Sequence, residues 1–325
     1  MATSEPYRRQ VALLLRMLPL VAAESVFALK GGTAINLFIR DMPRLSVDID
    51  LTFLPVLPRP ESLAQINAAM GRIKAAILTA IDGATVTRSL TENAVTRLYV
   101  SADGAQVKIE LSPVLRGTVF DPELRGVSAC VEDEFGYAEI PVVSFADLFA
   151  GKRVAALDRQ HPRDLFDVRD LLANEGLTED LREAFIVYLI SHNRPMHEVL
   201  SGRRKDLAQE FNNGFAGMTE RPVAIADLLK AQDDMITALI GGMPARHRDF
   251  LISFERGEPD WSRLTIPHAN TLPAVFWRPK ESGFPIRGTA PSAGGWPYCR
   301  FGMRNWRYDH SPSCLGARAA VTIHG

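Results

Sequence analysis

The sequence predicts an α/β N-terminal domain followed by an α-helical domain. First, a Gly-Gly turn lies between a short apolar run, Val26–Leu29, and a helical pattern at Thr33–Arg40. Second, two alternating segments flank the dipeptide Asp103-Gly104, which predicts a β-hairpin. Third, the apolar spacing is helical from Ser144 almost to residue 255, so we place the domain boundary near residue 144.

The elements before this boundary follow from periodicity and from breaker residues. Apolar spacing predicts helices, alternation predicts strands, and a cluster of prolines ends the second strand. In chain order we expect a helix at Pro6–Ala23, strands at Val26–Leu29 and Leu45–Phe53, a helix at Ser62–Ile81, hairpin arms at Thr96–Ser101 and Gln106–Ser112, and an extended run at Glu139–Val143. Ser144, with Asp147 three residues later, has the spacing of a helix-starting cap.

We expect three parts: an α/β domain at 1–143, a helical domain at 144–273 and a tail at 274–325. The tail is rich in Gly, Pro, Arg, Trp and Ser, is basic, and has neither helical nor strand periodicity. We interpret it as a disordered or non-native C-terminus, for example a frame-shifted one. The alternative is a basic RNA-binding arm whose aromatic side chains stack on bases.

The amino-acid composition is that of an ordinary globular protein. The 325 residues are 46% hydrophobic and 23% charged, which is ordinary for a globular protein large enough for two domains. The apolar segment Val11–Ala23 is interrupted by Arg16 and followed by Glu24, so it predicts an amphipathic helix rather than a signal peptide or a membrane span. We expect a cytoplasmic protein with no membrane partner. Its three cysteines have no metal-ligand spacing, and we expect reduced thiols.

The Gly-Gly turn and a pair of aspartates are candidates for binding a nucleoside triphosphate and a metal. Gly31 and Gly32 let the backbone approach phosphate oxygens, and the helix beginning near Thr33 supplies free N–H groups. By itself, this pattern also fits a plain strand-to-helix turn. Asp48 and Asp50 share one face of an extended segment, where repulsion disfavours joint ionisation unless a cation is present. The combination favours metal binding over a solvated strand edge.

The predicted hairpin supplies a third carboxylate. Val107, Ile109 and Leu111 form its apolar face and leave Lys108 and Glu110 on the other. If this strand neighbours the one that carries the aspartates, the glutamate could bridge the metal or take the proton from an attacking hydroxyl. A surface ion pair between the lysine and the glutamate is the alternative.

A fourth cluster follows the domain boundary. Lys152 and Arg159 are seven residues apart and can share a helix face, and a new helix then carries Arg163 and Asp164 in its first turn. These basic groups could neutralise a triphosphate, although charged helix faces are often only solvated. His161, in the connecting loop, favours a structural role.

These four pieces, in this order, resemble the AbiEii family of nucleotidyltransferase toxins. That family occurs in type IV toxin-antitoxin and abortive-infection systems and belongs to the polymerase-β-like nucleotidyltransferase superfamily. The matching segments are Lys30–Ala34, Arg44–Leu51, Lys108–Glu110, and Lys152 with the run Arg163–Asp167. The similarity spans about residues 25 to 175, with the expected helical domain after it.

The resemblance implies a fold and an activity. The fold would be a polymerase-β-like nucleotidyltransferase domain with a mixed α/β sheet, followed by helices. The activity would be metal-dependent transfer of a nucleoside monophosphate from an NTP to an RNA acceptor, the tRNA 3′ end, using a two-Mg²⁺ site. The partner would be a separately encoded antitoxin. By resemblance, Asp48, Asp50, Glu110 and Asp164 are catalytic, the first three bind metal, and Gly31, Gly32, Thr33, Ser46, Lys152 and Arg163 bind the nucleotide. The wider superfamily often has an aspartate at the position of Glu110, whose side chain is longer by one methylene group.

Two other functions fit the same residues. One is a nucleotidyltransferase that acts on a small molecule or on a protein hydroxyl, which fold alone does not distinguish. The other is a non-catalytic module that binds a nucleotide or RNA. Convergence of three carboxylates would favour catalysis, because close anions cost stability unless a cation is bound.

Overall fold

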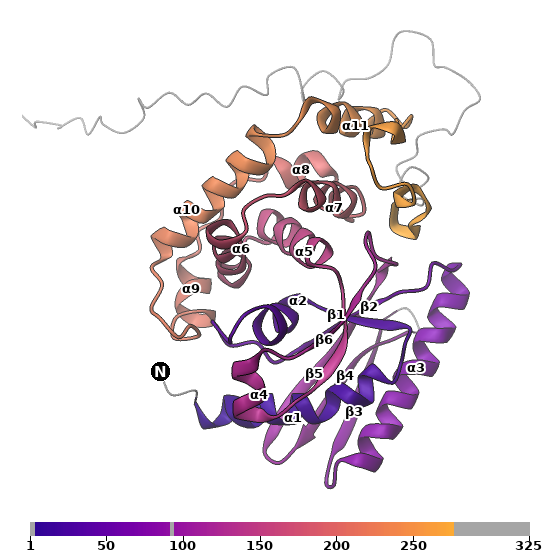
Figure 1. The fold of residues 1–325 in the computed structure, drawn as a ribbon, viewed down its shortest axis with the longest axis vertical. Coiled ribbons are helices and arrows are strands. Elements are labelled where there is room, and N and C mark those ends of the chain that lie inside the picture. Colours follow the sequence, from indigo (N-terminus) through magenta and orange to yellow (C-terminus); the bar gives the residue numbers. More distant parts are fainter. Residues whose placement is uncertain (1–3, 92–93, 276–325) are drawn as a thin grey trace, which may run out of the picture. The chain divides into compact units, whose positions relative to one another are not determined.

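The central element is a seven-stranded sheet (Figure 1). The computed structural model describes residues 4–91 and 94–275. The strands are β1 (Phe27–Lys30), β2 (Ile49–Phe53), β3 (Thr85–Thr91), β4 (Ala94–Ala102), β5 (Ala105–Arg116), β6 (Glu123–Gly126) and β7 (Glu139–Val142), and their spatial order is β3-β4-β5-β2-β1-β7-β6.

The sheet is mixed, as the sequence predicts. β2 lies parallel to β5 on one side and antiparallel to β1 on the other, and β1 runs parallel to β7. The hairpin of β4 and β5 turns at Asp103 and Gly104, whose φ angles of 52° and 71° match the paired positive φ values of a type I′ turn. The hairpin prediction is therefore confirmed.

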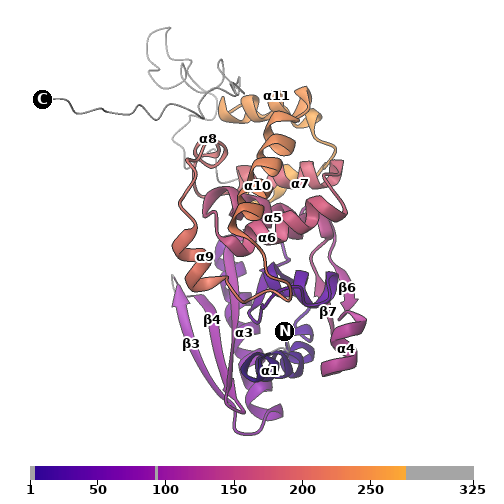
Figure 2. The ribbon, with the colours of Figure 1, turned by 90° about the vertical axis from the view of Figure 1, so that its left-hand side faces the viewer.

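Helices pack against the sheet and against one another. The α-helices are α1 (Glu5–Ala22), α2 (Gly31–Ala34), α3 (Arg59–Ala80), α4 (Ala129–Phe135), α5 (Phe145–Asp158), α6 (Pro162–Asn174), α7 (Glu179–Ile190), α8 (Met196–Leu200), α9 (Ala208–Gly214), α10 (Ile225–Ile236) and α11 (Ala245–Glu255). Of these, α1 and α3 pack on the sheet, while α5, α6, α7 and α10 group together beyond its end (Figure 2). None of the helices in the described ranges is long and apolar enough to cross a membrane.

The helical region begins where the sequence predicts it. Ser144 Oγ accepts a hydrogen bond from the Asp147 backbone N–H at 3.0 Å and donates one to its carboxylate at 2.7 Å. This reciprocal cap starts α5 directly after the last strand of the sheet. One hydrophobic core continues across this point, so the division into domains near residue 144 stays a prediction. The predicted tail falls almost entirely outside the described residues.

Two predicted elements differ from the structure. The strand expected from Leu45 begins regular pairing only at Ile49, because the backbone of Leu45 is held elsewhere, by a hydrogen bond to Met218 O at 2.8 Å. The residues from Ser46 to Asp48 are therefore an extended lead-in to β2. The helix expected at Thr33–Arg40 starts two residues earlier, as α2, and continues as a π-helical turn, Ile35–Ile39.

Candidate active site

The Gly-Gly turn is packed against the side chains predicted to form the site. Gly31 has a φ of +79°, and a Cβ built on it would lie 2.3 Å from Asp50 Oδ2. A Cβ on Gly32 would lie 2.7 Å from Arg44 Nη2 and 2.8 Å from Ser46 Oγ. These separations are too short for real atoms, so both positions need glycine for the aspartate, the arginine and the serine to reach the turn.

Ser46 is fixed in place at this turn. Its hydroxyl lies 3.2 Å from the hydroxyl of Thr33, which is fully buried. Its backbone N–H donates to the Tyr7 hydroxyl of α1 at 3.4 Å, and Asn36 donates to the same hydroxyl at 3.1 Å. The nucleotide-binding candidates at positions 31, 32, 33 and 46 therefore lie together around the turn.

Asp50 lies between the turn and β5. It pairs in register with Lys30 of β1 and with Glu110 of β5. Burial raises the pKa of Asp50, and Lys30 and Lys152 only partly offset this. Burial also lowers the pKa of Lys30. Within the described residues, no side chain forms a hydrogen bond or an ion pair with the Asp50 carboxylate, although Lys30, Lys152 and Lys108 are close enough to attract its charge.

Asp48 and Glu110 are joined through one lysine. Lys108 Nζ lies 3.3 Å from Asp48 Oδ2 and 2.6 Å from Glu110 Oε2, and Arg97 Nη2 lies 2.7 Å from the other glutamate oxygen. Burial works against ionisation of Glu110, but Lys108 and Arg97 outweigh it and lower the pKa of this carboxyl. Glu110 is thus an ionised carboxylate that already has two cationic partners.

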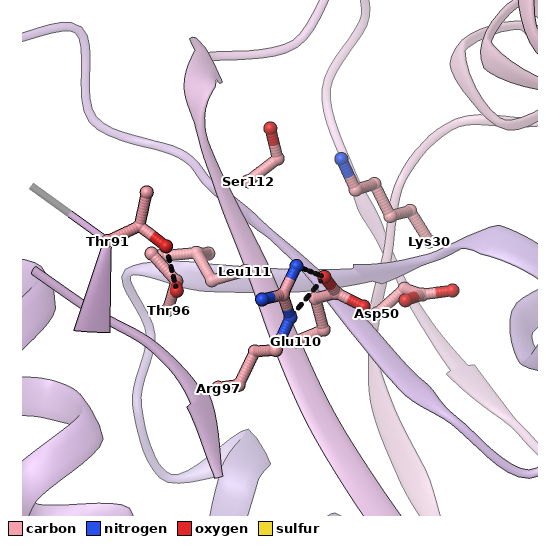
Figure 3. Close-up of a pocket in the computed structure, with 8 residues that line it drawn as sticks. All are labelled: Lys30, Asp50, Thr91, Thr96, Arg97, Glu110, Leu111 and Ser112. Atoms are coloured by element: carbon pink, nitrogen blue, oxygen red, sulfur yellow. Dashed lines mark hydrogen bonds and ion pairs between the residues drawn. The ribbon is translucent and has the colours of Figure 1, made fainter. Parts of the chain in front are cut away.

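A pocket opens over this group of side chains (Figure 3). Its volume is about 300 Å³, which is within the range of small-ligand sites. In Figure 3 the Arg97 guanidinium reaches across to Glu110, with Asp50 and Lys30 on the far side. The lining residues are Lys30, Asp50, Thr91, Thr96, Arg97, Glu110, Leu111 and Ser112.

A buried ion-pair network borders the turn. Arg44 donates to both carboxylate oxygens of Asp167 at 2.7 Å, and Lys152 Nζ lies 3.0 Å from both Asp164 and Asp167. Arg159 Nη2 donates to Asp164 at 2.8 Å. Although burial alone would raise it, Lys152 and Arg159 hold the pKa of Asp164 well below its usual range. This network attaches the segment before β2 to α5 and α6.

The predicted residues thus lie together with one exception. The Gly-Gly turn is in direct contact with Ser46 and Asp50. Lys152, which pairs with Asp164, is close enough to attract the charge of Asp50. The exception is Arg163, an exposed residue in the first turn of α6 whose side chain has no hydrogen bond or ion pair to any described residue. His161 has the expected structural role: its Nδ1 accepts from the Arg163 N–H at 3.1 Å and caps α6.

Four charged residues of this site have no role predicted from the sequence. They are Lys30, Arg44, Arg97 and Asp167, and all but Arg97 lie in the segments that resemble the family. The hairpin register pairs Arg97 with Glu110, and the turn position alone would have given that register. The pairing of Arg44 with Asp167 joins residues far apart in the chain, and no local pattern predicts it.

The carboxylates differ in how well they fit a divalent cation. Asp50 fits, because it is a partly buried carboxylate that makes no hydrogen bond or ion pair with a described side chain. Asp48 is half-exposed and shares one lysine, so it can turn to the same cation. Glu110 would have to release Lys108 or Arg97 before it could bind a second one. Hard divalent cations such as Mg²⁺ prefer carboxylate oxygens of this kind.

Substituting Gly31 with Ala is expected to lower both stability and activity, because its Cβ would collide with Asp50. Gly83 is the matched control: its φ is +70°, but a Cβ there meets nothing within 4 Å. G83A should therefore cost only the left-handed strain of about 1–2 kcal/mol. Chemical denaturation of both variants checks this. Equal losses of stability in G31A and G83A would contradict the proposed contact.

Comparisons with known proteins identify the family and the fold. A search of curated proteins finds no match to the sequence. A solved structure of MenT4, a nucleotidyltransferase toxin from Mycobacterium tuberculosis H37Rv, is similar, with a TM-score of 0.56 and 16% identity over 75% of this chain and 87% of that chain. This likeness supports the fold. The family model described as "Nucleotidyl transferase AbiEii toxin, Type IV TA system" matches residues 12–274. The chain therefore belongs to the AbiEii family of nucleotidyltransferase toxins.

Proposed function

We propose that this toxin transfers a nucleoside monophosphate from an NTP to the 3′ end of an RNA, with tRNA as the acceptor, in a reaction that depends on Mg²⁺. The observation that carries the proposal is the partly buried Asp50 carboxylate, which lies against the Gly31-Gly32 turn and has no hydrogen bond or ion pair to a described side chain. A carboxylate beside a phosphate-binding turn needs a cation between the two negative groups. The AbiEii family further implies an antitoxin partner, which we propose is encoded separately.

Each part of the site has a role in this reaction. The Gly31-Gly32 backbone and the hydroxyls of Thr33 and Ser46 would bind the triphosphate. Asp48 and Asp50 would hold Mg²⁺, which when bound neutralises charge on the phosphates as the acceptor hydroxyl attacks and pyrophosphate leaves. Glu110 keeps the Lys108 ammonium and the Arg97 guanidinium at the mouth of the pocket, where they can meet anionic substrates.

The buried network would present positive charge to the triphosphate. Asp164 and Asp167 hold Lys152 from two sides, and Asp164 also binds Arg159. We assign Lys152 to phosphate binding and Asp164 to the catalytic site as the group that positions it. Exposed Arg163 would complete the cationic surface where the triphosphate enters.

A basic loop beside the site supports a polyanionic acceptor rather than a small molecule. Residues 201–206, between α8 and α9, are exposed and include Arg203, Arg204 and Lys205 (Figure 2). The buried Gln160 side chain donates to Arg203 O at 2.9 Å and accepts from Lys205 N at 3.0 Å, so the loop is held against the end of α5.

The loop is adjacent to the catalytic network and carries uncompensated charge. Lys205 Nζ donates to the backbone carbonyl of Arg159, whose guanidinium binds Asp164. Arg204 pairs with Asp233, whereas neither Arg203 nor Lys205 has an ion-pair partner among the described residues. Cations that lack carboxylate partners are available for phosphate groups.

The double variant R203A/K205A is expected to weaken RNA binding without changing NTP binding. Each lost phosphate contact should reduce the slope of log affinity against log salt concentration by about 1. Filter binding of tRNA across a salt series measures this slope. The matched control is R248A, which removes an exposed arginine on α11 and should leave the slope unchanged. An unaltered slope in the double variant would contradict this acceptor surface.

The experiment that tests the proposed function is label transfer. The protein is incubated with Mg²⁺, total RNA and each α-labelled NTP in turn, and the products are separated and mapped. We expect label at RNA 3′ ends, in the tRNA size range, and no transfer in the presence of a chelator. Label in a small molecule or on a protein would support the alternative acceptors. NTP binding without any transfer would support a non-catalytic module.

A further inference from the structure

A second group of metal-ligand side chains lies away from the catalytic pocket, between α7 and α11. Glu179 and Glu183 are one turn apart on α7, and His247 lies in the first turn of α11. One ligand atom from each of the three residues lies within 4.8 Å of the other two. Glu183 and His247 are buried, while Glu179 is half-exposed and gives the cluster access to solvent.

The imidazole of His247 is the observation that points to a ligand. His247 is fully buried, and neither ring nitrogen has a hydrogen-bond partner within the described part of the chain. Buried polar atoms in folded proteins are nearly always paired, so two unpaired nitrogens on one ring need an explanation. Its Nε2 atom faces both glutamates.

The separations of the imidazole nitrogen from the two carboxylates match a tetrahedral zinc site. His247 Nε2 lies 3.3 Å from Glu179 Oε1 and 3.6 Å from Glu183 Oε1. Zinc bonds of about 2.0–2.2 Å at tetrahedral angles place neighbouring ligand atoms about 3.3–3.6 Å apart. The side chains therefore need only small adjustments to share one ion, and a water molecule could supply the fourth ligand.

Arg246 now occupies part of the space that such an ion would neutralise. Its Nη2 lies 3.0 Å from Glu183 Oε1 and also contacts Glu179. The side chain is 38% exposed, so it can swing toward solvent. Glu183 would stay in place without it, because Thr265 donates to this carboxylate from both its backbone N–H, at 2.9 Å, and its hydroxyl, at 2.6 Å. Arg246 thus competes with a metal but does not block it.

We propose that Glu179, Glu183 and His247 form a Zn²⁺ site that displaces Arg246 and joins α7 to α11. The set of one imidazole and two carboxylates suits Zn²⁺ better than Mg²⁺, which prefers oxygen ligands alone. The site is separate from the pocket over Asp50, so it does not depend on the proposed transfer reaction. Its function is to fix α11 to α7, because the ion would bind side chains from both helices at once.

Zinc titration of the chelator-stripped full chain, in excess Mg²⁺ to occupy oxygen-only sites, tests the proposal. Calorimetry should show one Zn²⁺ site, and thermal unfolding should shift upward as zinc is added. E179Q, which removes a half-exposed ligand without disturbing the core, should weaken binding by about tenfold or more. H247Q should do the same, whereas H268Q, which alters an exposed histidine outside the cluster, should bind as the wild type does.

The variant R246M distinguishes a zinc site from an ion-pair network. If Arg246 competes with zinc, this variant should bind Zn²⁺ several-fold more tightly than the wild type. If the cluster is only an ion-pair network, R246M should lose stability that zinc does not restore. Absence of zinc binding in both the wild type and R246M would overturn the proposal. Zinc binding that persists unchanged in both E179Q and H247Q would also overturn it.

Discussion

D50N is expected to abolish nucleotidyl transfer, with a loss of about 10³-fold or more, while the folded state stays at least as stable as the wild type. Asp50 is the carboxylate closest to the Gly-Gly turn, so losing its charge would remove a ligand of the Mg²⁺ that we propose neutralises the transferring phosphate. Single-turnover label transfer measures the activity, and chemical denaturation at neutral pH measures the stability.

The expected stability of D50N follows from the sign of the pKa shift. Burial raises the pKa of Asp50 above its ordinary value, so the unfolded state releases this proton more easily than the folded state. As pH rises through the interval between the two pKa values, ionisation disfavours folding, and Asn removes this cost. The advantage of D50N should therefore appear above that interval and vanish below it.

D121N is the matched control for D50N, since it neutralises an exposed aspartate away from the site. It should keep wild-type activity and stability. Transfer in D50N at more than a tenth of the wild-type rate would contradict the assignment of Asp50. So would loss of transfer that is accompanied by unfolding, because the Asn variant should remain folded.

D167A is expected to destabilise the fold by about 3–5 kcal/mol, because it leaves a buried arginine without its carboxylate. Arg44 is 2% exposed and Asp167 is 1% exposed on their side chains. Lys152 loses one of its two partners at the same time. Urea denaturation of the wild type and D167A measures the difference in the free energy of unfolding.

A double variant distinguishes a lost ion pair from lost packing. R44M/D167L replaces both buried charges with apolar side chains, and should lose less stability than D167A alone. Its transfer activity should nevertheless fall, because the bidentate contact between Arg44 and Asp167 fixes the segment that leads to Ser46. Equal stability of D167A and the wild type would refute the structural role of this pair.

Acid should weaken the same network. The pKa of Asp164 is held below its ordinary value by Lys152 and Arg159, so its contribution to stability is present above the ordinary carboxyl pKa and is lost as pH falls below it. The stability difference between the wild type and D164N should be constant above about pH 5 and shrink in more acid solution. A difference that does not depend on pH would contradict the ion pairing.

Local patterns predict the parts of the fold that depend on neighbouring residues. The Asp103-Gly104 turn determines the hairpin and its register, and the Ser144 cap gives the start of α5. The alternation of apolar and polar residues along β5 also predicts that Ile109 is buried while Glu110 faces the site. These features need only side-chain periodicity and turn chemistry, both of which are visible in a single sequence.

The parts of the fold that the sequence does not predict depend on contacts between residues far apart in the chain. The late start of β2 depends on the hydrogen bond between Leu45 and Met218 and on the ion pair between Arg44 and Asp167. The role of glycine at position 32 also becomes apparent only once Arg44 lies beneath the turn. The hydrogen bond and the ion pair join segments more than one hundred residues apart, so spacing and composition carry no signal for them.

Co-crystallisation with Mn²⁺ and a non-hydrolysable analogue of the NTP that supports transfer is the most direct test of the central claim. Anomalous difference maps then locate the ion. We expect a peak coordinated by Asp48 and Asp50, with the triphosphate against the backbone of Gly31 and Gly32. A triphosphate bound elsewhere, or no ion at Asp50 while the analogue is bound, would contradict the account.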